Sequence, residues 1–280
     1  MTVTPTDTDD TFVRAWQEWH RAHERALADP HGFLAVTGLH WLTPQAQRFP
    51  DVPGEWHTDN ESVSVTLAGG ERLTVDGRPV TGRHAFGPIA ERGGVTVDID
   101  GGVLEVARRG GRYLLRPRFP DHPLRTRFRG TPAFPPDPRW VLSGLFVPFD
   151  VPRPTTVGAA VEGLQHIYDA PGRIEFEVDG VSLRLTAFNG AAPGSLSVLF
   201  TDATSGVSTY RANRSLAVGA PDARGRVTVD FNRATNLPCA YTDFATCPLP
   251  PAENRLPVAV EAGEKIPYER LATPERVGQP

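Results

Sequence analysis

The residues Ile174–Leu185, with the sequence IEFEVDGVSLRL, alternate apolar and polar side chains on either side of the dipeptide Asp179-Gly180. Strict alternation over a few residues is typical of a β-strand that buries one of its faces. Asp-Gly is a favoured two-residue turn between such strands, because both positions accept a positive φ. The stretch therefore predicts a β-hairpin with strands at residues 174–178 and 181–185.

The same alternation recurs along most of the chain, and glycine- or proline-rich turns separate its segments. Helical periodicity does not return at length after the N-terminal region. Many short strands joined by such turns are typical of a sandwich or a barrel. We therefore predict a mainly β fold, an antiparallel sandwich or a partly open barrel, with further strands at residues 63–67, 95–99, 103–106, 113–115, 140–146, 196–200, 227–231 and 258–260.

The N-terminal region is the segment with clear helical periodicity. Aromatic and apolar side chains recur there at the spacing of one helix face, at Phe12, Trp16, Trp19, His23 and Leu27. We expect one amphipathic helix over residues 10–28, packed on the sheet and preceded by a disordered tail of residues 1–9. A metal could bind His20 and His23 on this helix, but histidines at the boundary of an amphipathic face are the interpretation that we prefer.

The domain organisation follows from the absence of a flexible linker. Proline is dense and periodicity lapses over residues 117–138, which we interpret as a long connection between two sheets of one domain. No internal repeat recurs at a fixed period. We therefore predict a single β-rich domain over residues 10–268, and two domains with a seam at residues 117–138 are the alternative. It would include an ordered loop over residues 229–266 and be followed by a C-terminal tail of residues 269–280.

Composition excludes several classes of partner. The net charge is -4 and the isoelectric point is near 6.1, whereas nucleic-acid binding needs a basic surface. No apolar run approaches the roughly 18 residues that cross a membrane. Two cysteines do not make a disulfide framework, and the polar, acidic N-terminus is no signal peptide. We expect a cytoplasmic protein that binds neither nucleic acid nor membrane.

The common catalytic motifs are missing from the chain. It contains no G-x-G-x-x-G, no phosphate-binding G-x-x-x-x-G-K-[ST], no G-x-S-x-G and no H-E-x-x-H. Rossmann redox chemistry, nucleotide hydrolysis and the common serine-hydrolase architecture are therefore disfavoured. The two cysteines lie too far apart along the chain for the usual zinc sites, so we predict no metal site and identify no cofactor.

The chemistry-bearing residues concentrate in the segment 229–265, VDFNRATNLPCAYTDFATCPLPPAENRLPVAVEAGEK. It holds both cysteines, the only lysine of the chain and five prolines, which exclude regular helix and central strand from most of it. A segment this polar needs a reason to be ordered. We expect it to gather charged groups around a small pocket, because binding residues are often carried by loops on a rigid scaffold.

Four residues of this segment are candidates for catalysis. Asp230 and Glu264 could act as general acid or base, and Lys265 could supply an amine that loses its proton. Cys239 could act as a nucleophile if a histidine and a carboxylate reached it from elsewhere in the chain. The alternative for Cys239 is a buried, inert thiol, since free cysteine is among the most buried residue types.

The candidates for ligand binding share a polar side chain suited to orient a small anion or to line a pocket mouth. An arginine is expected among them because its guanidinium fork donates two parallel hydrogen bonds to a carboxylate or phosphate. Most of the eight arginines in residues 108–129 would face solvent, and one would point inward. The candidates are Arg116, Asp202, Tyr210, Asn232, Asn254, Arg255 and His40.

Three C-terminal segments together resemble a known family. They are residues 200–210 (F-x-D-x-T-x-G-x-x-T-Y), residues 230–234 (D-F-N-x-A) and residues 238–265, which contain P-C-A, T-C-P-L-P-P-x-x-N-x-L-P and A-G-E-K. With G-L-x-W-L at residues 38–42, the chain resembles the bacterial and archaeal domain-of-unknown-function family 1684 over about residues 10–268. Thr235 stands where an aromatic residue is expected in that family. The resemblance implies no known reaction.

Two functions remain open from the sequence. The first is an enzyme or binding protein for a small, anionic metabolite, with a pocket built around the C-terminal segment. The second is a non-catalytic β-module in which the segment is a structural latch and the surface serves a protein partner or self-association into a homo-oligomer. The sequence does not decide whether the protein is an enzyme.

Overall fold

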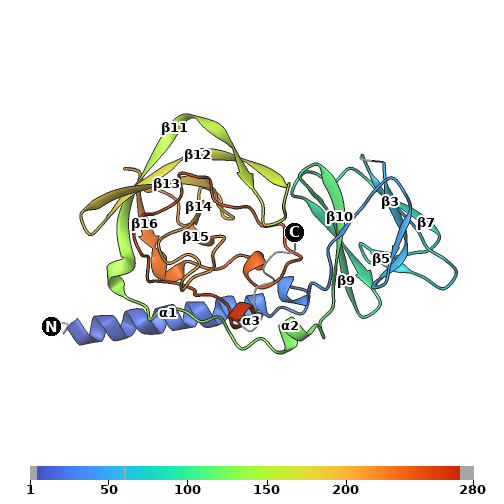
Figure 1. Ribbon diagram of the computed structural model, residues 1–280, viewed down its shortest axis with the longest axis horizontal. Helices are drawn as coiled ribbons and strands as arrows, with labels where there is room; N and C mark the ends of the chain where they lie inside the picture. Colours follow the sequence, from blue (N-terminus) through green and yellow to red (C-terminus); the bar gives the residue numbers. More distant parts are fainter. Residues whose placement is uncertain (1–4, 60, 272–280) are drawn as a thin grey trace, which may run out of the picture. The chain divides into compact units, whose positions relative to one another are not determined.

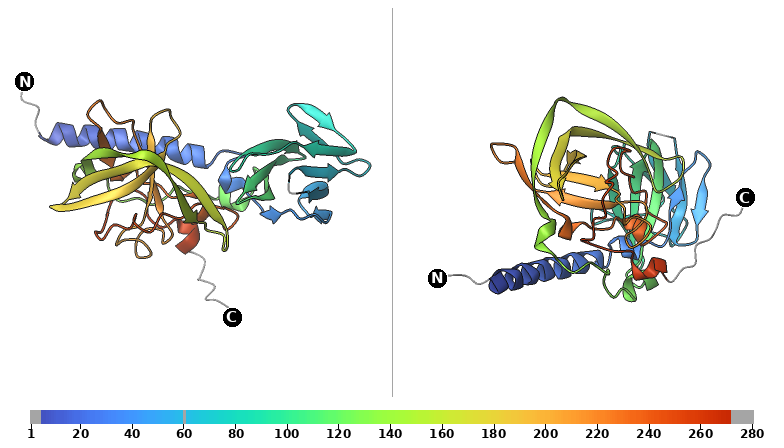
Figure 2. Two further views of the ribbon diagram at one scale, coloured as in Figure 1. Left: turned by 90° about the horizontal axis from the view of Figure 1, so that it is seen from above. Right: turned by 60° about the vertical axis from the view of Figure 1, so that its left-hand side comes forward.

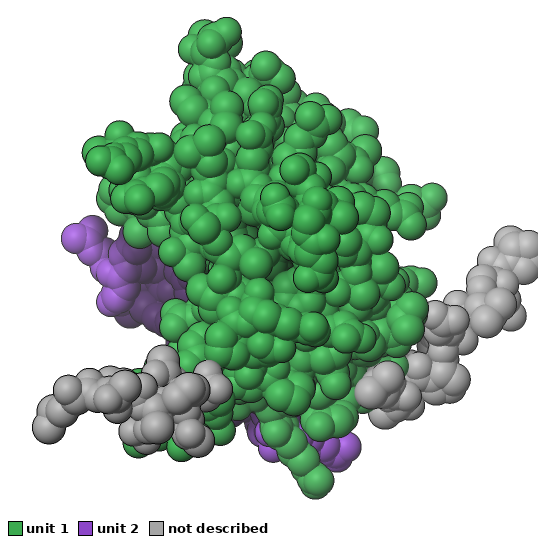
Figure 3. Space-filling model, turned by 90° about the vertical axis from the view of Figure 1, so that its left-hand side faces the viewer, with its two compact units in different colours: residues 1–25, 129–241, 247–280 green, residues 26–128, 242–246 purple. Residues whose placement is uncertain are grey.

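The computed structural model describes residues 5–59 and 61–271 (Figure 1). Contacts group the chain into two compact units, coloured separately in Figure 3. Unit 1 contains residues 1–25, 129–241 and 247–280, and unit 2 contains residues 26–128 and 242–246. The single domain over residues 10–268 stays a prediction beside this grouping by contacts.

The prediction of a mainly β fold is confirmed. The described residues form three antiparallel sheets, of six, six and four strands. One of them is the sheet of unit 1, in the order β15-β14-β13-β12-β11-β16, which curls into a half-barrel whose edge strands β15 and β16 contact each other. Its strands are β11 (Val141–Gly158), β12 (Gln165–Val178), β13 (Val181–Asn189), β14 (Leu196–Phe200), β15 (Arg214–Val218) and β16 (Arg226–Asp230).

The predicted hairpin lies at the centre of this sheet. Strands β12 and β13 pair from Gly172 opposite Ala187 to Val178 opposite Val181. Asp179 and Gly180 form the turn with φ of 48° and 80°, the left-handed conformation that this dipeptide accepts. The alternation of the sequence therefore places one face of the hairpin in the core of unit 1.

Aromatic side chains organise the core of unit 1 around Phe231. This fully buried ring meets Trp140, Phe176 and Phe200 edge-on, with ring centroids 6.1, 5.6 and 5.4 Å apart. Edge-to-face pairs of this kind stabilise a core beyond the area they bury. The 3-10 helix η3 (Phe231–Arg233), which begins the C-terminal segment, is thereby fixed inside the half-barrel.

The N-terminal helix α1 (Pro5–Leu27) begins five residues before its predicted start, within the region that we expected to be a disordered tail. It runs along unit 1 on the side opposite β11 and β12, as Figures 1 and 2 show. Its predicted apolar face is the less exposed one, and the indole Nε1 of Trp16 donates to the carbonyl of Asn232 at 2.7 Å. No helix in the described part of the chain is long and apolar enough to cross a membrane.

Unit 2 contains the other two sheets around its own core, in which Trp56 is fully buried. The strands predicted at residues 95–99, 103–106 and 113–115 are confirmed, and they pair in chain order as β8–β9 and β9–β10. The strands of the first sheet are β1 (His40–Trp41), β10 (Arg112–Arg118), β9 (Gly102–Arg109), β8 (Gly94–Ile99), β5 (Leu73–Val75) and β6 (Arg78–Val80). Those of the second are β2 (Gln47–Phe49), β3 (Val52–Thr58), β4 (Val63–Thr66) and β7 (Arg83–Phe86).

The remaining elements are short. The proline-dense residues 117–138, which we interpreted as a connection within one domain, contain the boundary between the units. The strand predicted at residues 258–260 is wrong, because single hydrogen bonds to residues 202 and 203 replace a ladder there.

The short helices are η1 (Phe33–Ala35), α2 (Pro123–Thr126), η2 (Pro138–Trp140), η4 (Pro238–Ala240) and α3 (Tyr268–Leu271). Helix α3 overlaps the predicted C-terminal tail.

Candidate functional site

Asn254 bridges two strands of the half-barrel at the point where they separate. The β13–β14 ladder is short, with partners only at Phe188 and Asn189 of β13. Beyond it, the Asn254 side chain accepts from the Thr186 N–H at 2.7 Å and donates to the carbonyls of Thr186 and Leu199, both at 2.8 Å. The Asn254 side chain thus replaces backbone hydrogen bonds that β13 and β14 do not make with each other at this point. Its three hydrogen bonds therefore stabilise the fold.

Asn232 and Asp230 also bind backbone. The Asn232 side chain exchanges two hydrogen bonds with the main chain of Asp137, at 2.8 and 2.9 Å, and donates to Asp230 at 3.0 Å. The Asp230 carboxylate caps η3 by accepting from the Asn232 N–H at 3.1 Å, and it lies 3.3 Å from Arg233 Nε. Both residues stabilise the start of the C-terminal segment.

Asp202 forms a buried ion pair with Arg214, at 2.8 Å between Oδ2 and Nη2, and both side chains are at most 1% exposed. The other carboxylate oxygen accepts from the N–H and hydroxyl of Thr204, at 2.7 and 2.5 Å. The Arg214 guanidinium also donates to the carbonyls of Val260 and Ala262. Burial lowers the pKa of Arg214. The pair therefore ties the C-terminal segment to the turn after β14.

The other predicted residues of unit 1 do not converge on one cavity. Arg255 is exposed, Tyr210 is half-buried, and the Lys265 Nζ lies over the ring of Phe134, 4.3 Å from its centroid. None of Asp230, Arg255 and Lys265 lines either of the two cavities described below.

Cys239 and Cys247 are free, buried thiols. The Cys239 N–H donates to the Cys247 Sγ at 3.3 Å. A hydrogen bond with Cys247, together with burial, raises the pKa of the Cys239 thiol. A nucleophile needs the thiolate, so this environment disfavours the catalytic role that we considered for Cys239.

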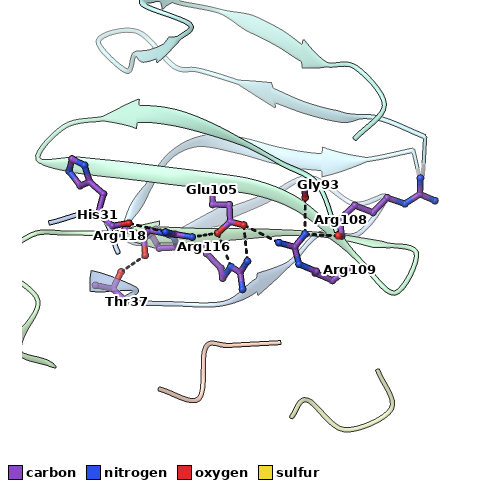
Figure 4. Close-up of polar contacts among 9 residues, drawn as sticks. His31, Thr37, Gly93, Glu105, Arg108, Arg109, Arg116 and Arg118 are labelled. Atoms are coloured by element: carbon purple, nitrogen blue, oxygen red, sulfur yellow. Dashed lines mark hydrogen bonds and ion pairs between the residues drawn. The ribbon is translucent and has the colours of Figure 1, made fainter. Parts of the chain in front are cut away.

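Arg116 lies in unit 2, where three arginines surround one carboxylate (Figure 4). Arg116 donates to Glu105 through Nε at 3.1 Å and Nη2 at 2.7 Å, and Arg109 and Arg118 bind the same carboxylate. Burial favours the neutral acid, but Arg116 and Arg118 hold the pKa of Glu105 below its usual range. The Arg116 fork is therefore occupied by Glu105.

His40 also lies in unit 2, on β1, and its ring stacks on Phe49 with centroids 4.3 Å apart. Burial lowers the pKa of His40, against a smaller effect of Asp51. His40 and Arg116 thus belong to unit 2, whereas the C-terminal segment belongs to unit 1 except for its residues 242–246.

Glu264 is the member of the C-terminal segment around which titratable groups gather, and its side chain is only 1% exposed. One carboxylate oxygen accepts from the Asn236 N–H at 2.6 Å. The other lies 3.2 Å from Nε2 of His23 and 3.7 Å from Nε2 of His20, both on α1. The sequence shows the two histidines on one helix face, but nothing in it connects them with Glu264.

The charge of Glu264 is maintained in spite of its burial. Burial raises the pKa of a carboxyl, but the neighbouring side chains of His20 and His23, the charge of His23 and the hydrogen bond from the Asn236 N–H together lower it below its ordinary value. Burial raises the pKa of the neighbouring Tyr241, whose hydroxyl lies 2.7 Å from the Thr131 hydroxyl. Among the described residues, no group of three or more His, Cys, Asp or Glu side chains could hold a metal ion.

A separate cavity of about 250 Å³ opens on β11, β12 and β13 of unit 1. We call it the arginine pocket, because three guanidiniums line it with one aromatic ring, one hydroxyl and one carboxylate. Glu253 brings the C-terminal segment to its wall, one residue before the bridging Asn254. The lining residues are Phe149, Arg153, Arg173, Arg184, Thr186 and Glu253.

Neighbouring groups orient these side chains and leave donors open. Arg173 donates through Nε to Glu175 at 2.7 Å, and Arg153 lies over the Phe149 ring, 3.8 Å from its centroid. The Thr186 hydroxyl donates to Glu253 at 3.0 Å, so its lone pairs can accept from a ligand. Within residues 5–59 and 61–271, Arg184 makes no hydrogen bond or ion pair. The arginine pocket therefore combines a cavity with uncommitted cationic groups.

Sequence reasoning did not find the arginine pocket. Arg173 and Arg184 flank the predicted hairpin in the positions that alternate with its buried residues, so their shared face was readable from the pattern. The position of Arg153 could not be predicted from the pattern, because the register between β11 and β12 shifts between Pro148 and Arg153.

A half-barrel of antiparallel strands, closed by an irregular C-terminal segment that is tied to it by hydrogen bonds, defines the structural class of unit 1. The chain belongs to the family described as protein of unknown function DUF1684, which it matches over residues 126–265. This match confirms the resemblance and covers half of the chain, less than the residues 10–268 over which the resemblance was seen.

Comparison with solved structures finds a protein that its title calls uncharacterised. A solution NMR structure of a protein from Haloarcula marismortui is 34% identical, over 50% of this chain and 78% of that chain, with a TM-score of 0.42. No curated protein matches the chain.

Proposed function

We propose that this protein binds a small anionic ligand in the arginine pocket. The observation that supports it is the meeting of three guanidiniums from three adjacent strands at one cavity. The fork of a guanidinium suits the planar oxygens of a carboxylate or phosphate. A volume of about 250 Å³ suits a small metabolite and falls just below the usual range for drug-sized ligands.

The charges of the pocket favour an anion over a neutral ligand. Two carboxylates, those of Glu175 and Glu253, stand beside the three guanidiniums, so the site keeps a net positive charge. The Phe149 ring makes a cation–π contact with the Arg153 guanidinium. This contact orients the guanidinium before a ligand binds. Such preorganisation reduces the entropy lost on binding.

Isothermal titration with inorganic phosphate, succinate and citrate tests this function. Arg184→Ala is the informative variant, because removing a side chain without partners leaves no other group unpaired. A lost hydrogen bond to a charged group costs about 1.5 kcal/mol, which is roughly a tenfold weaker Kd. Arg224→Ala is the matched control, since Arg224 is an exposed arginine of the same unit outside the pocket.

The expected result is binding of at least one of the three anions that Arg184→Ala weakens and Arg224→Ala leaves unchanged. Wild-type protein that binds none of them, or an equal loss in both variants, would contradict the proposal.

We infer a second role, structural, for the C-terminal segment. The three hydrogen bonds of Asn254 and the buried Asp202–Arg214 pair support a latch that holds the open side of the half-barrel. The latch and the ligand are compatible, because Glu253 of the pocket is positioned by the Asn254 that follows it.

A further inference from the structure

A second cavity, of about 800 Å³, opens on the same sheet beside the arginine pocket. Arg184 lines both cavities, so they meet at this side chain. We call the second cavity the outer groove. Its other lining residues carry hydroxyls, carboxylates, apolar groups and a second guanidinium, among them Ser143, Leu145, Glu177, Ser182 and Arg226.

The strand register places the charged side chains of the two cavities in a row. Opposite partners on β12 and β13 are Arg173 with Thr186, Glu175 with Arg184, and Glu177 with Ser182. Every second residue of a strand lies on the same face, so these three pairs follow one another on one side of the sheet. The row runs from positive at Arg173 to negative at Glu177, and four residues of strand separate these two by about 13 Å.

The acidic end of the row has capacity for a ligand. Glu175 is bound by Arg173, and the Arg226 Nε is bound by Asp222 at 2.7 Å. Glu177, by contrast, is exposed and has no ion pair or hydrogen bond through its side chain in the described part of the chain. The hydroxyls of Ser143 and Ser182 stand beside it in the groove.

From this charge arrangement we propose that the ligand is elongated, with an anionic group in the arginine pocket and an ammonium group at Glu177 in the outer groove. This inference rests on the proposed function, because it needs the anion to be held first. The Leu145 side chain, exposed beside the groove, offers an apolar surface to the middle of such a ligand.

A series of simple probes measures the second charge separately from the first. Extended 8-aminooctanoate separates its carboxylate and ammonium by about 10 Å, given carbon bonds of about 1.5 Å. Octanoate lacks the ammonium, and suberate replaces it with a second carboxylate. Since exposed ion pairs are weak, we expect 8-aminooctanoate to bind about two- to fivefold more tightly than octanoate.

The Glu177→Gln variant identifies the group responsible. It should remove the preference for 8-aminooctanoate and leave the Kd of octanoate unchanged, whereas Glu162→Gln, an exposed glutamate of the same unit, should leave both unchanged. Equal binding of 8-aminooctanoate and octanoate by wild-type protein would overturn the inference and leave the proposed function standing, and so would a preference that survives in Glu177→Gln. Failure of all three probes, and of the compact anions above, would overturn both.

Discussion

Replacing Glu264 with glutamine tests whether the buried carboxylate connects α1 with the C-terminal segment through its charge. Glutamine keeps the size of the side chain and can still accept from the Asn236 N–H, now 2.6 Å from the carboxylate. It loses the charge that faces His23 at 3.2 Å and His20 at 3.7 Å. A hydrogen bond to a charged group contributes about 1.5–3 kcal/mol and breaking a buried pair costs about 3–5 kcal/mol, so we expect a loss near 3 kcal/mol.

The direction of the Glu264 pKa shift determines how the stability difference between wild type and Glu264→Gln changes with pH. The pKa of Glu264 is lower in the folded protein than its ordinary value of 4.5. The stabilisation is therefore complete above the unfolded pKa and is lost as the pH falls through the folded one. Urea unfolding of wild type and Glu264→Gln should differ most above pH 4.5, and the difference should shrink progressively as the pH falls below this value.

The matched control is Glu261→Gln, an exposed glutamate three residues earlier in the same segment. It should change the free energy of unfolding by less than about 0.5 kcal/mol, as surface substitutions usually do. The reasoning fails if Glu264→Gln is as stable as wild type at pH 7, or if the difference persists unchanged at acidic pH where the Glu264 carboxyl of the wild type is protonated.

Two further substitutions test the latch. Asn254→Ala should cost about 2–4 kcal/mol in urea unfolding, because it leaves the Thr186 N–H and the carbonyls of Thr186 and Leu199 unpaired in the interior; an unchanged unfolding midpoint would refute the bridging role. Gly263→Ala should destabilise by more than about 2 kcal/mol, since Gly263 has a φ of 73° and a new Cβ would lie 2.5 Å from the carbonyl oxygen of Ala234; normal stability of that variant would show that the backbone can relax there.

Local patterns were sufficient to predict the strands and their turns. The hairpin at residues 174–185 and the strands β8, β9 and β10 were predicted, because alternation and turn preference depend on residues next to each other. The division into two units was not, because it depends on pairings between distant segments. Strand β16, for example, pairs with β11 from Asp230 opposite Val141.

The C-terminal segment was correctly expected to be irregular, but the tasks of its side chains were not readable. An asparagine or aspartate in a proline-rich segment can bind a ligand or its own backbone, and the sequence contains no signal that separates the two. Asn232 and Asn254 bind backbone, whereas Glu264 faces two histidines that precede it by more than half the chain.

Residue order alone determined that this protein is mainly β, where its hairpins turn and which helix begins it, since these properties follow from the chemistry of neighbouring side chains. Folding in three dimensions decided that three arginines share a cavity and that Glu264 meets His20 and His23. The physical reason is that a β-sheet brings together residues through hydrogen bonds between distant strands, and the closure of those long loops leaves no mark on the local pattern.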